Sequence, residues 1–293
     1  MDYQEIRLRI GRPIVFVRDM KEYFITINNE ITINEEKGLI IHENELRETL
    51  EFISNHSMYA FEEEIKNGFI TISGGHRVGI CGRAVIEDGK IKTIKNISFI
   101  NIRIAHERIG CSKFLMKYLY ESDGKVRNTL IISPPLFGKT TLIRDIIRNI
   151  SNGSMGYIGQ NVGVSDERSE IAACYLGIPQ NDVGIRTDVM DGMPKSYGIM
   201  MLIRTMSPKV VAIDEIGTDK DVEAILYGLN SGSRFVATVH AESIEEIKEK
   251  ASIEKLIEKK VFDRYLVLNK DDGLRSAYIY NANMEKMGNE LIE

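Results

Sequence analysis

The sequence lacks the features that are typical of secreted, membrane-spanning and nucleic-acid-binding proteins. Its 293 residues contain no apolar run of about 18 residues, so we expect no spanning helix and no direct membrane insertion. The first residues, Met1–Glu5, show neither the basic nor the apolar region of a signal peptide, and we expect a cytoplasmic protein. Basic residues are not in excess, because 38 Lys and Arg stand against 43 Asp and Glu, which disfavours nucleic acid as the main partner.

Cysteine and histidine are also scarce. The cysteines at positions 81, 111 and 174 are odd in number and far apart, which indicates reduced thiols rather than disulfides or a zinc site. The histidines at 42, 56, 76 and 106 show no spacing of metal ligands. What remains is 43% apolar and 28% charged residues, a composition typical of a soluble protein, and a length that allows two domains.

The most informative segment is Ser133–Thr141, which follows the apolar run 130–132 directly. A buried strand, a loop and a helix, expected from Thr140 to Ile150, are the context of a phosphate-binding loop. Backbone N–H groups of such a loop favour an anion. Lys139 is expected to neutralise the β- and γ-phosphates of ATP, and the Thr140 hydroxyl to bind Mg²⁺. The predicted nucleotide-binding residues of this segment are Ser133, Pro134, Pro135, Phe137, Gly138, Lys139, Thr140 and Thr141.

The match to the phosphate-loop motif is incomplete, because Ser133 stands where the first glycine is expected. Serine has a Cβ atom and tolerates a positive φ less readily than glycine. The residues expected around the phosphates, Gly138–Thr140, are intact. The alternative is a turn that merely caps an ordinary helix. A second motif favours the phosphate loop.

That second motif is Val210–Glu215, an apolar run that ends in two carboxylates. It predicts a buried parallel strand that delivers acidic side chains to its carboxyl end, where open α/β sheets bind ligands. We expect Asp214 to hold Mg²⁺, directly or through water, and Glu215 to polarise the attacking water. The pair of motifs predicts Mg²⁺-dependent ATP hydrolysis.

Two further strand ends carry polar side chains. In the segment 162–170, Asp166 or Glu167 could order the water around the metal or the attacking water, although an acidic first turn of a helix has the same composition. At the end of the run 235–239, Thr238 or His240 could contact the γ-phosphate, although His240 could equally be an ordinary loop histidine.

Four arginines are candidates for an arginine finger, which stabilises the charge of the transition state. Arg186 and Arg204 flank the helix expected before Pro208, and Arg77 and Arg103 lie in the first part of the chain. The alternative for each is a surface arginine that pairs with acidic neighbours.

Residues 1–122 are predicted to form a smaller α+β domain, with its boundary in the loop 121–125. Glu5–Ile10 alternates polar and apolar residues, as a half-buried strand does, and Asp88-Gly89 within 77–98 predicts a β-hairpin. The other expected strands are Ile14–Val17, Tyr23–Ile27, Phe69–Ile72 and Phe99–Ala105, and the expected helices are Glu43–Asn55, Ser57–Asn67 and Ser112–Tyr120.

Residues 123–293 show the alternation of a parallel α/β sheet, so the fold class is α/β. Apolar runs at 129–132, 157–164, 210–214 and 235–239 alternate with helical segments. The segments 261–268 and 275–280 predict two closing strands joined across Asp271–Gly273, and the charged stretch 245–260 predicts a solvated helix face.

Several segments together resemble the family of stage III sporulation protein AA of endospore-forming bacteria. The resemblance extends over about residues 3 to 280 and so includes both domains. The segments that carry it are Ile72–Gly79, Ser98–Ala105, Ser133–Pro135 with Gly138–Thr141, Asp166–Ala172, Gly184–Val189 and Met200–Arg204.

That family resembles the hexameric ATPases of type II and type IV secretion and pilus machines. The resemblance implies a RecA-like P-loop ATPase core with a smaller α+β N-terminal domain, and a homo-oligomer, most simply a hexamer. It implies a cytoplasmic ATPase of the mother cell, docked through a membrane-protein partner on a complex between mother cell and forespore. In the secretion ATPases, the segments matched here by Asp166–Glu170 and Thr238–Ala241 serve the nucleotide. Those ATPases carry Gly-Glu where this chain has Asp214-Glu215, which leaves the metal arrangement open.

An ATP-driven ring motor is therefore favoured over two alternatives. A nucleic-acid motor on the same core would need a basic channel, and the acidic balance argues against one. A scaffold that binds ATP and barely hydrolyses it would have no need of Glu215.

Overall fold

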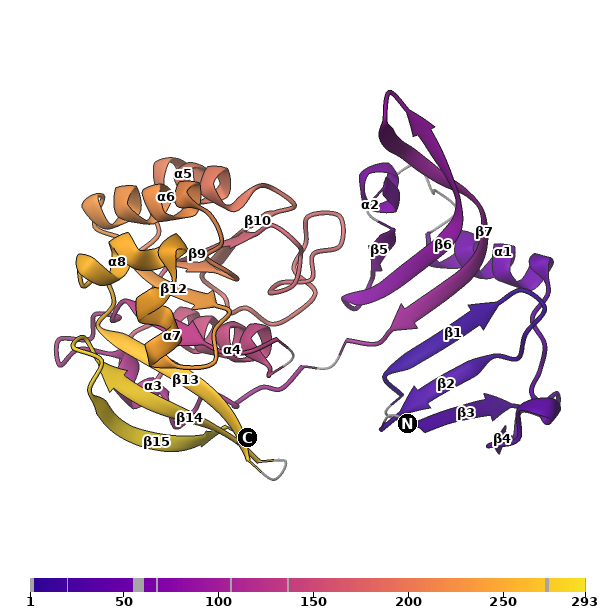
Figure 1. Cartoon of the computed structure of the whole chain (residues 1–293), viewed down its shortest axis with the longest axis horizontal. Coiled ribbons are helices and arrows are strands. Elements are labelled where there is room, and N and C mark those ends of the chain that lie inside the picture. Colours follow the sequence, from indigo (N-terminus) through magenta and orange to yellow (C-terminus); the bar gives the residue numbers. More distant parts are fainter. Residues whose placement is uncertain are drawn as a thin grey trace. The chain divides into compact units, whose positions relative to one another are not determined.

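A computed structural model of the chain describes residues 3–19, 21–54, 61–66, 68–105, 107–135, 137–271 and 274–292. The chain forms two compact units (Figure 1). Unit 1 comprises Met1–His106 with Ala173–Gln180, and unit 2 comprises Glu107–Ala172 with Asn181–Glu293.

Unit 1 is built on an antiparallel sheet, whose strands in the described residues run in the order β4-β3-β2-β1-β7-β6-β5 (Figure 1). The strands are β1 (Glu5–Arg9), β2 (Val15–Arg18), β3 (Lys21–Ile25), β4 (Ile31–Thr32), β5 (Phe69–Ile72), β6 (His76–Glu87) and β7 (Lys90–Arg103). The helices are η1 (Glu35–Lys37), α1 (Glu43–Ile53) and α2 (Glu62–Lys66). Of the predicted helices, 43–55 is present as α1, whereas residues 55, 57–60 and 67 of the two predictions lie outside the described residues.

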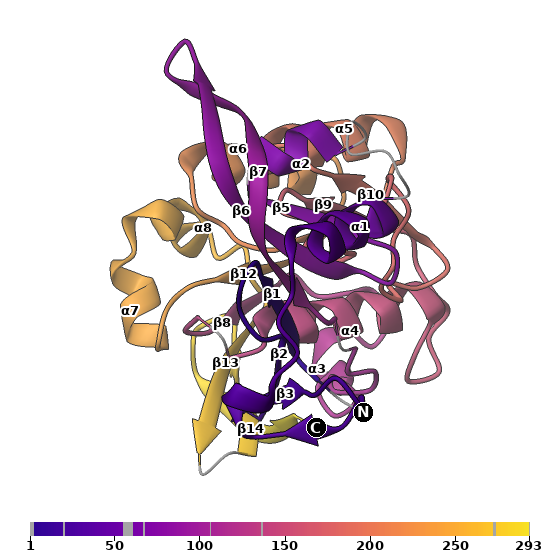
Figure 2. The ribbon, with the colours of Figure 1, turned by 90° about the vertical axis from the view of Figure 1, so that its right-hand side faces the viewer.

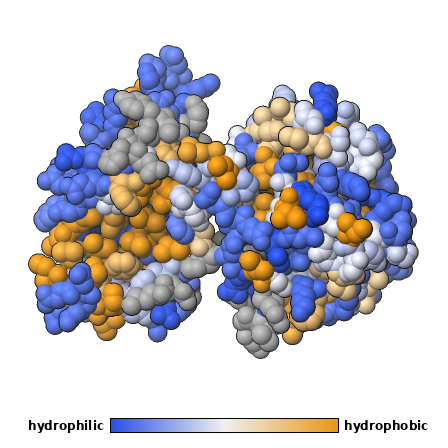
Figure 3. Space-filling view, turned by 180° about the vertical axis from the view of Figure 1, so that it is seen from behind, coloured by the Kyte–Doolittle hydropathy of each residue, from blue (hydrophilic) through white to orange (hydrophobic). Residues whose placement is uncertain are grey.

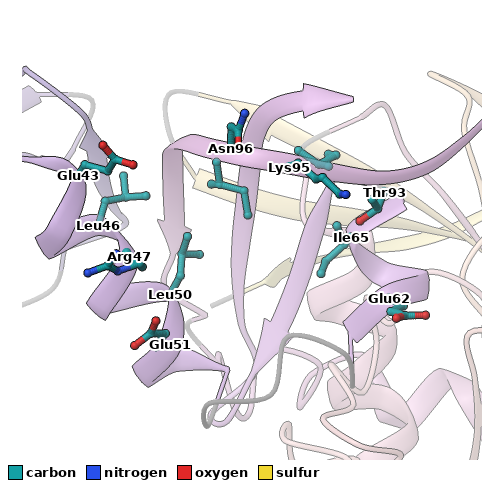
Figure 4. A pocket seen from close by; sticks show the side chains of 12 residues that line it. Glu43, Leu46, Arg47, Leu50, Glu51, Glu62, Ile65, Thr93, Lys95 and Asn96 are labelled. Atoms are coloured by element: carbon teal, nitrogen blue, oxygen red, sulfur yellow. The ribbon is translucent and has the colours of Figure 1, made fainter. Parts of the chain in front are cut away.

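The core of unit 1 follows from alternation along its strands. Leu8 of β1 and Ile100 of β7 pack with Leu46 of α1 and Ile65 of α2, so the helices cover the apolar face of the sheet. A cavity of about 520 Å³ opens between α1, α2 and β7, with charged side chains around its apolar floor (Figure 4). Unit 1 also presents a broad apolar area on the face seen in Figure 3.

The predicted hairpin at Asp88-Gly89 is confirmed. Both residues have a positive φ, 51° and 74°, which is the geometry of the tight turns that match strand twist. β6 and β7 continue as a ribbon past the rest of the sheet of unit 1 (Figure 2). Gly82 allows their close approach at a register shift, because a Cβ atom there would lie 2.6 Å from the Lys95 carbonyl oxygen.

Unit 2 contains a mixed sheet in the order β10-β9-β11-β12-β8-β13-β14-β15 along the described residues. In this order, each neighbouring pair from β10 through β9, β11, β12 and β8 to β13 is parallel. β14 and β15 continue the sheet as antiparallel strands. The strands are β8 (Thr129–Ile132), β9 (Val162–Asp166), β10 (Thr187–Asp191), β11 (Val210–Ile213), β12 (Arg234–Val239), β13 (Arg264–Asp271), β14 (Leu274–Asn281) and β15 (Lys286–Ile292). The helices are α3 (Met116–Leu119), α4 (Lys139–Asn152), α5 (Lys195–Thr205), α6 (Asp219–Asn230), α7 (Ile244–Glu249), η3 (Ala251–Ile253) and α8 (Glu254–Glu258).

The sheet of unit 2 is buried on both faces. Leu130, Val211 and Phe235 belong to the core beneath α5 and α6, whereas the fully buried apolar side chains of α4 are not part of that core. Figure 1 shows α4 on the other side of the sheet from α5 and α6. Because helices cover both faces, the strands have continuous apolar sequences, which explains why most were predictable.

The predicted α/β fold is confirmed, with local differences. The strand expected over 157–164 is limited to β9, and the strands β10 and β15 were not predicted. The helix expected over 112–120 is only α3, and the stretch 245–260 contains α7, η3 and α8 instead of one helix. The two closing strands are present as β13 and β14, while residues 272 and 273 of their turn lie outside the described residues.

Residues 107–122 belong to unit 2, although the predicted domain boundary lies at residue 122. The cause is Asp145 of α4, a buried carboxylate that accepts hydrogen bonds from the Gly110 and Ser112 N–H groups at 2.9 and 2.8 Å and from the Ser112 hydroxyl at 2.7 Å. These charge-assisted bonds attach the segment before α3 to α4.

Candidate functional site

The candidate site lies at the carboxyl edge of the parallel strands in unit 2. β8, β9, β11 and β12 are neighbours in the order β9-β11-β12-β8, so the residues that follow them lie along one edge. This edge receives Ser133–Pro135, Phe137-Gly138, Asp166–Glu170, Asp214-Glu215 and His240. The sheet topology thus brings together the four segments in which the sequence placed candidate residues.

The loop after β8 leads directly into α4. Gly138 is the N-cap residue and has a φ of 93°, which glycine adopts without the steric cost that other residues would meet. The first N–H groups of α4 have no carbonyl partner within the helix, and with the helix dipole they favour an anion at this position. α4 begins at Lys139, one residue before the predicted start at Thr140.

Ser133 occupies the place of the motif's first glycine without a positive φ. It is fully buried at the end of β8, its N–H donates to the Val239 carbonyl at 3.2 Å, and its hydroxyl donates to the Pro134 carbonyl at 2.9 Å. The backbone at this position therefore does not need glycine, and serine is accommodated. Pro135 is exposed on the loop, and Phe137 is half-buried beside Gly138.

Lys139, His240 and Glu215 form a chain of polar contacts. The Lys139 ammonium lies 3.2 Å from both ring nitrogens of His240, and His240 Nε2 lies 3.4 Å from Glu215 Oε2. Burial lowers the pKa of Lys139, while Asp214, Glu215 and Glu170 oppose that shift through their charges. Within the described contacts, negative charge reaches Lys139 only through His240 and from nearby carboxylates. A phosphate at the α4 N-terminus would give Lys139 a direct anionic partner.

Asp214 is the most perturbed carboxyl of the cluster. Its Oδ1 accepts from the Thr140 hydroxyl at 3.3 Å, and its backbone carbonyl accepts from the Thr238 hydroxyl. Burial, followed by the nearby charges of Glu170 and Asp166, raises the pKa of Asp214 to about 6. A hydrogen bond with Glu170 also favours the protonated form. Asp214 therefore lies in a buried, acidic environment that opposes its ionisation.

The three acids of the segment after β9 have different environments. Asp166 is fully buried and accepts hydrogen bonds from the N–H groups of Glu170, Ile171 and Ala172 at 2.8, 3.0 and 2.8 Å. Burial raises its pKa although these bonds oppose the shift. Glu167 pairs with Lys195 at 3.1 Å. Only Glu170 is hydrogen-bonded to Asp214 and acts on Lys139.

Sequence reasoning selected Asp166 and Glu167 from this segment and did not select Glu170. Asp166 shapes the turn, because its carboxylate ties down the N–H groups that follow it. Arg144 of α4 holds the same turn from the other side, donating to the Ile171 and Glu170 carbonyls at 2.5 and 2.7 Å. In the sequence, Glu170 is recognisable only as a glutamate four residues after Asp166. That spacing does not reveal which of the acids faces the site.

Two of the arginine candidates lie at the opposite edge of the sheet in unit 2. Arg204 is in the last turn of α5, which leads to the start of β11, and its guanidinium lies 5.9 Å from the Tyr227 ring centroid. Arg186 donates to the Ser151 carbonyl at the end of α4 at 2.9 Å, a favourable place for a cation. Neither joins the cluster within its own subunit, so a role for Arg204 would require a neighbouring subunit.

Arg77 and Arg103 lie side by side in unit 1. They are direct cross-strand partners on β6 and β7, and Arg103 is also the partner of Glu5 on β1. The Arg77 guanidinium lies 4.0 Å from the Phe69 ring centroid. The register places both guanidinium groups on the same face of the sheet.

The residues of the cluster fit a magnesium ion that shares its ligands with a nucleotide. Among the described residues, no group of three or more His, Cys, Asp or Glu side chains could hold a metal by itself. Mg²⁺ commonly takes one or two protein oxygens and completes its shell with phosphates and water. Thr140 Oγ1 and Asp214 Oδ1, 3.3 Å apart at the N-terminus of α4, are such a pair. Along the same described ranges, no helix has the length and apolarity needed to cross a bilayer.

The fold defined by these elements is that of secretion and pilus ATPases. The chain is similar to the ATPase DotB of Legionella pneumophila, with a TM-score of 0.57 and 14% identity over 96% of this chain and 78% of that one. It is similar to the pilus retraction motor PilT, solved with bound ADP, with a TM-score of 0.62 and 14% identity over 94% of this chain and 78% of that one. Identities this low carry the fold alone.

The chain belongs to the family "Sporulation stage III, protein AA", whose model matches residues 1–287. It is 41% identical to stage III sporulation protein AA of Bacillus subtilis over 273 residues, which are 93% of this chain and 84% of that protein. A more distant relative is the uncharacterized protein ycf45 of Cyanidium caldarium, 28% identical over 55% of this chain and 46% of that protein. The predicted family and the predicted ATPase-type fold are confirmed.

Proposed function

We propose that the chain is a Mg²⁺-dependent ATPase that works as a ring, most simply a hexamer, in a membrane complex between mother cell and forespore. The observation that carries this proposal is the meeting of Lys139, Thr140, Asp214, Glu215 and His240 at the N-terminus of α4. The bound ADP of PilT, a protein of similar fold, supports a nucleotide as the ligand.

The residues of the cluster divide the chemistry among them. The N-terminus of α4 and Lys139 bind the β- and γ-phosphates, and Thr140 with Asp214 holds Mg²⁺, which neutralises phosphate charge when bound. Glu215 orients and polarises the attacking water. His240 lies between Lys139 and Glu215, so it is placed to respond when the γ-phosphate leaves.

Glu170 completes the cluster in this proposal. Glu170 lies within hydrogen-bonding reach of Asp214, so with Mg²⁺ bound it would help to orient Asp214 and the water around the ion. Asp166 and Glu167 then act indirectly, Asp166 by shaping the turn and Glu167 by pairing with Lys195 at the start of α5.

The proposals of a ring and of a membrane partner depend on unit 1. Unit 1 presents a broad apolar area on the face seen in Figure 3, and an exposed apolar area favours contact with other proteins. Ile27 and Ile33 are both 81% exposed, which is unusual for such large apolar side chains. We propose that unit 1 provides contacts between subunits or with a membrane-protein partner, and that Arg77 and Arg103 act on the nucleotide of the assembled ring.

The test is steady-state ATP hydrolysis by the full chain. Glu215→Gln should keep nucleotide binding and lower turnover by about 10²- to 10⁴-fold, because the water loses its polarising carboxylate. Lys139→Ala should lose binding itself. Glu167→Gln is the matched control, since it removes the same charge from a neighbouring loop and should leave turnover nearly unchanged. Hydrolysis at the wild-type rate by Glu215→Gln would overturn the assignment.

A further inference from the structure

Arg275 of β14 lies directly against the loop that precedes α4. Its Nη1 atom is 3.0 Å, and its Cζ atom 3.6 Å, from the position that a Cβ atom on Gly138 would occupy. No motif in the sequence singles out Arg275, because β14 lies far along the chain from the loop. Strand pairing brings it there, since β13 lies beside β8 and β14 lies beside β13.

Arg275 shares a small cavity with a second arginine. The cavity has a volume of about 10 Å³, and Arg108, Gly138, Thr141 and Arg275 are among its lining residues. Of the described residues that line it, none is acidic. The Arg275 guanidinium therefore adds a positive charge beside the N-terminus of α4, which itself favours negative charge. A cation at this end of a helix repels the dipole, and an anion beside it would relieve that repulsion.

The strand order shows which part of a nucleotide would meet Arg275. β8 stands between β12, which His240 follows, and β13. Asp214, Glu215 and His240 follow β11 and β12, so the γ-phosphate of a nucleotide on the loop points to that side. The α-phosphate, ribose and base then extend toward β13 and β14, where Arg275 stands.

We propose that Arg275 binds the α-phosphate of the nucleotide, an inference that rests on the proposed function. The guanidinium carries a fixed positive charge and several N–H donors in a geometry that suits phosphate oxygens. The Arg275 guanidinium lies against Gly138 of the loop that would hold the phosphates, which favours a phosphate oxygen over the base as its partner. Lys139 and Arg275 thus hold the two ends of the phosphate chain.

The experiment compares the affinity of the full chain for ADP and for a non-hydrolysable ATP analogue, both with Mg²⁺, by titration calorimetry. Arg275→Ala should weaken both ligands by the same factor, about tenfold, because both contain the α-phosphate and lose one charge-assisted contact. Arg275→Lys should recover part of the affinity, since it keeps the charge and loses only the fork of donors. Lys286→Ala is the matched control. Lys286 lies on β15, at the far end of the β14–β15 pair from Arg275, so this variant removes one positive charge and should change neither affinity.

The outcomes separate this inference from the proposed function. A wild-type chain that binds neither ligand would overturn the proposed function, and this inference with it. A wild-type chain that binds both, with a folded Arg275→Ala variant of equal affinity, would overturn the inference alone. A loss limited to the ATP analogue would place Arg275 at the γ-phosphate, and a loss that Arg275→Lys does not reduce would indicate stacking on the base; either result contradicts the proposal. Unfolding curves of the three variants establish that each is folded.

Discussion

The sheets of the two units use their polar residues in different ways. In unit 2, β8 and β11 are buried along their whole length, so the charged side chains of these two segments stand where the strands end. In unit 1, β1 alternates, and its polar side chains, among them Arg7, line one face from end to end. The doubly covered sheet therefore concentrates chemistry at one edge, whereas the half-covered sheet spreads charge over a surface.

This difference decides how directly a functional residue can be recognised. A carboxylate at the end of a buried strand, such as Asp214, has few reasons to be there except its chemistry or a structural hydrogen bond. An arginine on an exposed face, such as Arg103, has the ordinary solvated face as a sufficient reason. The experiments that sharpen the comparison therefore ask whether Arg77 and Arg103 of unit 1 belong to the same reaction as the buried cluster of unit 2.

Among the tests of this contrast between the units, the largest effect is expected from the arginines of unit 1. Arg77→Ala or Arg103→Ala should fold and bind ATP, and should lower turnover by up to about 10³-fold, because an arginine finger stabilises the charge of the transition state. Steady-state hydrolysis measured over a range of protein concentrations checks this, and in a ring the wild-type activity should rise steeply with concentration.

Arg9→Ala is the control for these variants. The alternation of β1 places Arg9 on the same face of the sheet as Glu5, the cross-strand partner of Arg103. Activity regained on mixing an arginine variant with Glu215→Gln would show that the arginine acts across subunits. If both arginine variants hydrolyse ATP normally, the face is an ordinary solvated one and the contrast between the units becomes complete.

The second effect concerns pH, since buried and exposed acids should respond in opposite directions. Asp214 has a folded-state pKa of about 6, above its unfolded value, so its stabilising contribution is present at low pH and is lost as pH rises through about 6. Relative to Asp214→Asn, the nucleotide-free wild type should lose on the order of 3 kcal/mol of unfolding free energy between about pH 4 and pH 7.

Glu5 of unit 1 provides the opposite case. Burial acts to raise its pKa, but hydrogen bonds from Arg7 and Asn101 outweigh burial and lower it, so its contribution is lost as pH falls. Denaturant titrations at several pH values measure both slopes. A wild type and an Asp214→Asn variant with parallel pH profiles would show that Asp214 is not held in a raised-pKa state.

The smallest effect distinguishes acids within one loop. Glu170→Gln should lower turnover by about tenfold to a hundredfold, the range typical of a residue that orients a metal ligand, while Glu167→Gln changes it little. A readout besides activity is the Mg²⁺ concentration for half-maximal nucleotide binding, which should rise for Glu170→Gln alone. Equal behaviour of the two variants would remove Glu170 from the cluster.

The sequence by itself determined the elements that depend on local pattern. The apolar runs of β8, β11 and β12 predicted a parallel sheet, and Gly138–Thr140 with Asp214-Glu215 predicted where its ligand would bind. Asp88-Gly89 predicted a hairpin because a tight turn needs positive φ at adjacent residues. These features depend on residues that are adjacent in the sequence, so they could be predicted without the tertiary structure.

Only the tertiary structure decided which side chains meet. Asp166, Glu167 and Glu170 are equally acidic in the sequence, and the turn held by Arg144 directs Glu170 alone to Asp214. β10 and β15 escaped notice because their polar residues, such as Asp188 and Glu290, break the apolar pattern of a buried strand. Arg275 reaches Gly138 only because β14 is two strands from β8 in the sheet. Contacts of this kind depend on strand order and register, which are set by the packing of the whole sheet rather than by any one segment.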